Sequence, residues 1–101
     1  MSDLIAHLRT IQHRISVAEQ RFNRPPGSVS LLAVSKTHPP SLITPLIDAG
    51  QHDFGENYLQ EALLKISALS GKQLVWHFIG PIQSKKTQLI AENFSIVYVF
   101  Y

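Results

Sequence analysis

Hydrophobic residues recur at spacings of three and four over the first 22 residues and form a single stripe. The stripe consists of Leu4, Leu8, Ile11, Ile15, Ala18 and Phe22. This spacing predicts an amphipathic helix, because residues three or four apart lie on the same helix face. The run Pro25-Pro26-Gly27 predicts the end of that helix, since proline cannot continue the backbone hydrogen bonds.

After residue 27, short apolar runs alternate with stretches of helical periodicity. The apolar runs predict strands over 30–36, 53–57, 74–79 and 96–101. The stretches between them predict helices over 41–49, 58–70 and 84–94. Strands that alternate with helices through short links indicate parallel strands joined by crossover helices.

The predicted fold class is α/β, with about four parallel strands and a leading helix. A complete eight-stranded TIM barrel takes about 250 residues, so this chain supplies about half of one. Half a barrel leaves a strand edge unpaired and the apolar side of its helices uncovered. We therefore expect marginal stability and a tendency to self-associate.

Composition narrows the possible functions. Of the 101 residues, 45% are hydrophobic and 16% are charged, and the net charge of +2 gives no strong case for nucleic-acid or membrane binding. The absence of cysteine excludes disulfides and thiolate metal sites, and the five histidines lack metal-ligand spacing, so we predict no metal. No apolar stretch reaches the roughly 18 residues of a membrane span, and we expect a cytoplasmic location.

Three predicted strands bring polar side chains to one rim of the sheet. In parallel barrels and open sheets, ligands bind at the carboxyl ends of the strands. Those ends carry Lys36, then Glu56 with Asn57, then His77. An amine in partly apolar surroundings has a lowered pKa and can form a Schiff base with an aldehyde, which makes Lys36 the leading candidate.

Each of these residues also has a simpler interpretation. A lysine at a strand end usually carries its charge into solvent, and Asn57 could cap the helix that begins at Tyr58. Glu56 could be a surface carboxylate, and His77 could be a hydrogen-bonded core residue. Glu61 and Glu92 are expected on solvated helix faces, and the pair Lys85-Lys86 could bind phosphate or RNA but is more simply a solvated pair.

Three motifs stand in order along the chain and resemble those of a known family. They are Leu32-Ala33-Val34-Ser35-Lys36-Thr37, Phe54-Gly55-Glu56-Asn57-Tyr58 and Trp76-His77-Phe78-Ile79-Gly80. They resemble the YggS/PROSC family of pyridoxal 5′-phosphate (PLP) homeostasis proteins. The resemblance covers nearly the whole chain, but only the N-terminal part of the family.

The resemblance implies a partial TIM barrel of the alanine racemase N-terminal type. It implies that Lys36 holds PLP as a Schiff base and that Asn57 and His77 line the cofactor ring. It implies a cofactor-binding protein of PLP homeostasis with no catalytic residues, and intact relatives that are monomeric. The alternative is a fragment of a PLP-dependent enzyme, such as a racemase or decarboxylase. Residues 1–101 are expected to be the N-terminal part of the barrel domain, truncated at its C-terminus, since the family continues past the fourth strand.

Overall fold

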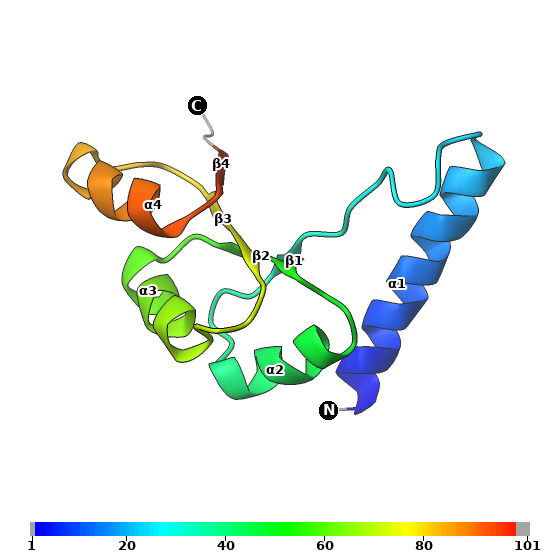
Figure 1. The fold of residues 1–101 in the computed structure, drawn as a ribbon, viewed down its shortest axis with the longest axis horizontal. Helices are drawn as coiled ribbons and strands as arrows, with labels where there is room; N and C mark the ends of the chain where they lie inside the picture. Colours follow the sequence, from blue (N-terminus) through cyan, green and yellow to red (C-terminus); the bar gives the residue numbers. More distant parts are fainter. Residues whose placement is uncertain (1, 99–101) are drawn as a thin grey trace.

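The computed structural model describes residues 2–98, which alternate between strands and helices after a long first helix (Figure 1). The elements are α1 (Ser2–Arg21), β1 (Ala33–Val34), α2 (Pro40–Asp48), β2 (Asp53–Glu56), α3 (Leu59–Ala68), β3 (Val75–Ile79), the 3₁₀ helix η1 (Ser84–Lys86), α4 (Thr87–Asn93) and β4 (Ile96–Tyr98). The predicted order of helices and strands is therefore confirmed. Residues 99–101 of the predicted fourth strand lie outside the described residues.

The four strands form one parallel sheet in the order β1-β2-β3-β4. Each strand pairs with the next one along the chain, and α2, α3 and α4 make the three crossovers. This arrangement confirms the predicted α/β class and the partial barrel. The carboxyl ends of all four strands consequently meet at one rim.

One face of the sheet packs against the crossover helices and holds the hydrophobic core. Phe54, Trp76 and Phe78 are buried there, and register places Phe54 directly beside Trp76. Phe78 and Phe94, which follows α4, meet edge to face with ring centroids 5.2 Å apart. The remaining buried members of this core come from the helices and the turn after α3: Ile43, Ile47, Ala62, Leu69 and Ile90.

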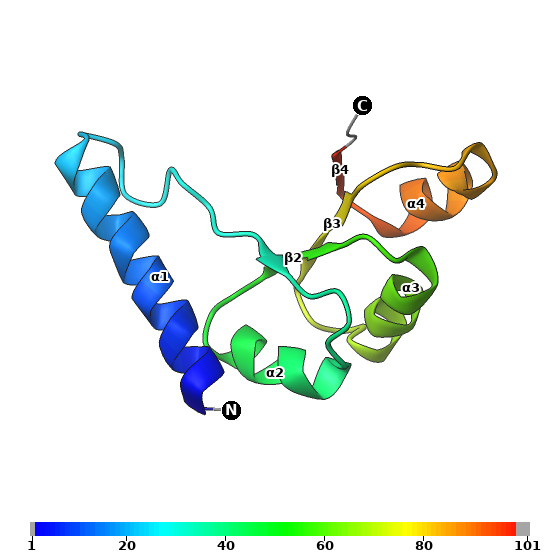
Figure 2. The ribbon, with the colours of Figure 1, turned by 180° about the vertical axis from the view of Figure 1, so that it is seen from behind.

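The opposite face of the sheet is largely open. Side chains alternate between faces along a strand, so this face carries Val34, His77, Ile79 and Tyr98. Val34 is 52% exposed and Tyr98 is 43% exposed. Within residues 2–98, no helix covers this face (Figures 1 and 2).

The predicted buried strand over 30–36 is wrong in both length and burial. Only Ala33–Val34 forms a strand, and it pairs with β2 alone among the described strands. Upstream, side chains replace a strand partner: the Glu19 carboxylate accepts the Val29 N–H at 2.8 Å, and Gln51 Nε2 donates to the Leu31 carbonyl at 2.7 Å. Because these side chains supply hydrogen-bond partners for the backbone, this part of the chain does not need to pair with a neighbouring strand.

The first helix stands apart from the layered body. Figures 1 and 2 show α1 at one side of the molecule, with its N-terminal end beside α2. Leu8 is the one residue of the predicted stripe that is buried, whereas Phe22 is 70% exposed. A cavity of about 250 Å³ lies between α1, α2 and β1. The stripe therefore predicted the helix correctly, although most of it is not buried within residues 2–98.

The other helices begin and end within a few residues of the predicted positions. The helix predicted over 84–94 divides into η1 and α4, because the first turn is wound as a 3₁₀ helix. Pro45 lies inside α2, five residues after its first residue, Pro40. None of the helices within residues 2–98 is both long and apolar enough to cross a membrane.

Candidate functional site

Lys36 is the second residue after β1, at the rim formed by the strand ends. Ser35 continues the pairing with β2, because its N–H donates to the Gly55 carbonyl at 2.9 Å. The chain then turns, and Lys36 is exposed. The described residues therefore do not enclose the Lys36 side chain, and its role as the anchor stays a prediction.

Strand register places the predicted site residues in layers. Val34 pairs with Gly55, and Gly55 pairs with His77, so these three lie level in neighbouring strands. Two residues further along their chains stand Lys36 and Asn57, at the rim. His77 therefore lies one layer below the rim, on the same face of the sheet as Val34.

The Asn57 side chain does not cap a helix. The residue at the N-cap of α3 is Tyr58, and no side chain caps that end. The Asn57 Oδ1 atom is buried and has no hydrogen-bond partner within residues 2–98. The capping interpretation is wrong, and a buried acceptor without a donor is uncommon enough to require an explanation.

His77 is buried in the centre of β3 and is held in one orientation. Its Nε2 atom lies 3.0 Å from Asp53 Oδ1, and its ring stacks on Tyr98 with the centroids 5.9 Å apart. Its Nδ1 atom is buried and has no partner among the described residues. The simpler interpretation, a hydrogen-bonded core histidine, accounts for Nε2 but leaves Nδ1 unexplained.

Gly55 allows the Ile79 side chain to approach β2 closely on the open face of the sheet. A Cβ atom at this position would lie 2.6 Å from Ile79 Cδ1, which is closer than real Cβ contacts. The absence of a side chain lets Ile79 lie across β2 just below the rim. Glycine in the centre of a strand commonly marks such a close approach.

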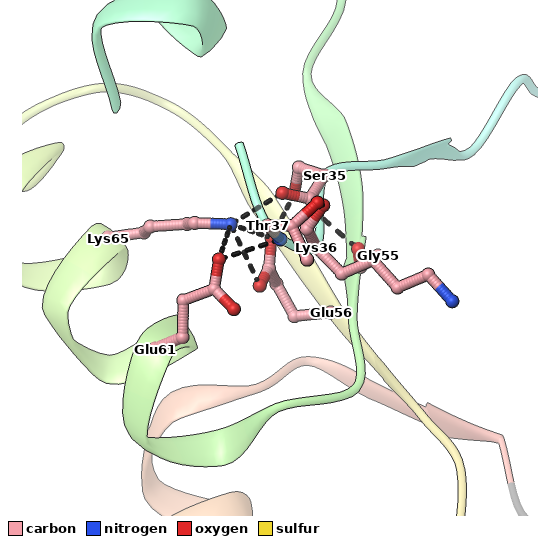
Figure 3. A network of polar contacts seen from close by, with 7 residues as sticks. All are labelled: Ser35, Lys36, Thr37, Gly55, Glu56, Glu61 and Lys65. Atoms are coloured by element: carbon pink, nitrogen blue, oxygen red, sulfur yellow. Dashed lines mark hydrogen bonds and ion pairs between the residues drawn. The ribbon is translucent and has the colours of Figure 1, made fainter. Parts of the chain in front are cut away.

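A buried ion cluster lies below the Lys36 turn, on the helix side of the sheet (Figure 3). Lys65 Nζ lies 2.9 Å from Glu56 Oε2 and 3.0 Å from Glu61 Oε1. Lys65 Nζ also donates to the Ser35 carbonyl, and the Ser35 hydroxyl donates to Glu56. Figure 3 shows Lys65 approaching from α3, while the Lys36 side chain extends away from it.

This cluster changes the interpretation of Glu56 and Glu61, and it includes Lys65, which the sequence analysis did not consider. Glu56 is not a surface carboxylate, because it is fully buried and faces α3. Glu61 is only partly solvated: its side chain is 33% exposed, pairs with Lys65 and accepts the Thr37 N–H at 2.7 Å. Lys65 was not singled out at all. The i,i+4 spacing of Glu61 and Lys65 was the available signal, although it occurs on many exposed helices.

Comparison with known proteins places the chain in context. No protein-family model matches it. The pyridoxal phosphate homeostasis protein of Escherichia coli is 50% identical over 97 residues, which cover 93% of this chain. The protein of the same name from Pseudomonas aeruginosa is 50% identical over 98 residues, which cover 97% of it. The chain is a homologue of the pyridoxal phosphate homeostasis proteins.

The chain spans 42% of the length of the E. coli pyridoxal phosphate homeostasis protein and 43% of the P. aeruginosa one. The resemblance that the three motifs predicted is thus confirmed.

Two solved structures share the fold. PipY of Synechococcus elongatus, in a structure with PLP bound, is 41% identical with a TM-score of 0.68, over 81% of this chain and 39% of PipY. A protein of unknown function from Bifidobacterium adolescentis is 28% identical with a TM-score of 0.84, over 95% of this chain and 44% of that protein. These likenesses agree with the partial barrel seen in residues 2–98.

Proposed function

We propose that this chain carries the cofactor-contacting part of a PLP-binding site, with Lys36 as the covalent anchor. The proposal is supported by the homology to pyridoxal phosphate homeostasis proteins and by the PLP bound in PipY. The observation that carries it is a pair of buried polar atoms, Asn57 Oδ1 and His77 Nδ1, which have no hydrogen-bond partner within residues 2–98. Asn57 directly follows β2 and His77 lies in β3, where an incoming polar ligand would satisfy both atoms.

The chemistry needs an amine at the rim and polar groups beside it. PLP supplies an aldehyde, which condenses with a lysine amine to form a C=N bond and releases its oxygen as water. Lys36 provides the amine, on a turn fixed to the sheet by Ser35. Asn57 and His77 would orient the ring. The prediction that residues 1–101 form the first part of a larger barrel domain is part of this proposal.

We propose binding without turnover. A racemase or decarboxylase needs a second acid or base that faces the lysine across the cofactor. Of the two other proposed site residues, Asn57 does not titrate, and His77 lies one layer below the rim at which Lys36 stands. With PLP and L-alanine present, we therefore expect no D-alanine and no carbon dioxide. Product that disappears in Lys36→Ala would overturn this part of the proposal.

The remaining predictions extend the same proposal. The ligand is a small molecule, with no nucleic acid and no membrane as partner. Intact relatives are monomeric, and the location is cytoplasmic. The nucleic-acid alternative predicts salt-sensitive RNA retention that is lost in Lys85→Ala/Lys86→Ala.

Borohydride trapping tests the anchor directly. The parent chain is incubated with PLP and reduced, which converts the C=N bond to a stable C–N bond, and the adduct is then located by peptide mass mapping. We expect the adduct at Lys36, and in Lys36→Ala we expect the total pyridoxyl adduct to fall without a new major site at another lysine. Lys72→Ala is the matched control, because Lys72 is also exposed but follows α3, away from the rim. An adduct spread evenly over the lysines would overturn the proposal.

A further inference from the structure

The turn that carries Lys36 adopts a conformation that its sequence does not favour. The Ser35 carbonyl accepts the His38 N–H at 3.1 Å and closes a turn around Lys36 and Thr37. Thr37 has a φ of +68°, in the left-handed region. Glycine or asparagine normally occupies this place in a turn, and a β-branched residue there is a genuine outlier. Strain of this kind persists only where the surroundings impose it.

Two residues of α3 hold this turn, one at its first residue and one at its third. Lys65 Nζ donates to the carbonyl of Ser35, the first residue of the turn. Glu61 Oε1 accepts the N–H of Thr37, the strained residue, at 2.7 Å. Since Lys65 and Glu61 are also 3.0 Å apart, the two contacts form one connected clamp.

The clamp is itself fixed by burial. The Lys65 side chain is 3% exposed, and the Glu56 side chain that it contacts is fully buried. Lys65 Nζ reaches both Glu56 oxygens, at 3.1 and 2.9 Å. A buried ammonium with this many acceptors has little freedom to move, so it defines the position of the Ser35 carbonyl.

We infer that Glu61 and Lys65 are positioning residues for Lys36. By holding Ser35 and Thr37 they keep the backbone of Lys36 in one conformation, from which its side chain leaves on the side away from α3 (Figure 3). A backbone that is already held in one conformation spares the amine part of the conformational search that a reaction at the rim would otherwise need. The inference rests on the proposed function for its ligand, whereas the clamp itself can be tested without PLP.

The first test measures amide hydrogen exchange at Thr37 in the absence of PLP. We expect the Thr37 amide to be protected in the parent, and also in Glu61→Gln, which keeps the acceptor oxygen. In Glu61→Leu, exchange at Thr37 should rise about tenfold or more, because its N–H loses its acceptor. The Gln51 amide, which donates to the Leu46 carbonyl at 3.0 Å, serves as the internal control and should not change. An unprotected Thr37 amide in the folded parent would overturn the inference.

The second test measures the rate of PLP trapping at Lys36 in the same variants. Glu61→Leu should slow trapping about tenfold, because the amine is no longer held in place, while Glu61→Gln should stay near the parent. The double variant Thr37→Gly/Glu61→Leu should recover much of the rate, since glycine adopts a positive φ without strain. A role in stability alone predicts instead that the trapping rate follows the fraction of folded chain, which circular dichroism measures in the same variants.

The two tests distinguish a failure of PLP binding at Lys36 from a failure of the positioning role of Glu61 and Lys65. If the parent shows no Lys36 adduct, PLP binding at this site is rejected, and Thr37 exchange still decides whether the clamp exists. If the parent forms the adduct, and Glu61→Leu forms it at the same rate with an unchanged circular dichroism spectrum, the positioning role is rejected.

Discussion

The two faces of the sheet carry different kinds of residue on the same strands. In β3, Trp76 and Phe78 point toward the helices and are buried in the core. His77 stands between them and points to the other face, where it meets Asp53 and Tyr98. The period of two along a strand thus separates packing from polar chemistry at neighbouring positions. Substitutions one residue apart should therefore have different consequences.

The rim turn joins the two faces. Ser35 points toward the helices and binds Glu56 and Lys65, whereas Lys36, the next residue, extends the other way. The helix side can therefore control the candidate anchor through the backbone, without a side chain on the open face. In the proposed site, one kind of residue holds the turn and the other reacts.

The covered face should be the more sensitive to truncation. Phe54 is fully buried among helix residues, so Phe54→Ala should lower the free energy of unfolding by about 4 kcal/mol. Urea unfolding followed by circular dichroism measures this loss. If the parent is stable by less than this amount, the variant should be unfolded and show no cooperative transition. Leu64→Ala is the control, because Leu64 is 74% exposed on α3. Equal losses in the two variants would contradict the assignment of the core.

Breaking the buried ion cluster should cause the second-largest loss in the free energy of unfolding. Lys65→Met leaves the buried Glu56 carboxylate without its cation, which should cost about 3 kcal/mol in the free energy of unfolding. The double variant Glu56→Leu/Lys65→Met removes both charges and should regain most of that loss, as measured by the same urea transition. If Lys65→Met alone were as stable as the parent, the cluster would not be a buried pair.

Periodicity alone predicted the helices and the parallel topology, because both depend on local spacing and short links. The apolar runs also predicted β2, β3 and β4, but not the length of the first strand. Of the run over 30–36, Ala33–Val34 forms the strand and Ser35 adds one hydrogen bond, because Glu19 and Gln51 satisfy the backbone around residues 29–31. Such long-range contacts between side chain and backbone leave no pattern in the sequence.

The candidate site was predicted unevenly for a related reason. Lys36, Asn57 and His77 follow from strand ends and from the family motifs, and their role as PLP contacts stays a prediction. The cluster beneath them was missed, because Glu56 and Lys65 are nine residues apart and charged residues are rarely buried. The pairing that buries them depends on how α3 packs on the sheet.

A close approach on the open face should give a smaller effect. Gly55→Ala places a Cβ atom against Ile79 Cδ1, the mobile end of a side chain, so we expect a loss of about 1 kcal/mol. Ile79→Val removes that methyl group, and Gly55→Ala in the Ile79→Val background should cost less than in the parent. A double-mutant cycle from urea unfolding measures the coupling. Simple additivity of the two changes would mean that the side chains do not meet.

The smallest effect is expected at Val34, on the open face of the edge strand. Val34 is 52% exposed, and threonine keeps its β-branched shape, so Val34→Thr should change the free energy of unfolding by less than about 0.5 kcal/mol. The same substitution makes the open face less apolar and should therefore lower the fraction of self-associated chain in sedimentation experiments. A loss of stability close to that of Phe54→Ala would mean that Val34 is covered in solution, and the contrast between the two faces would then fail at the strand that carries Lys36.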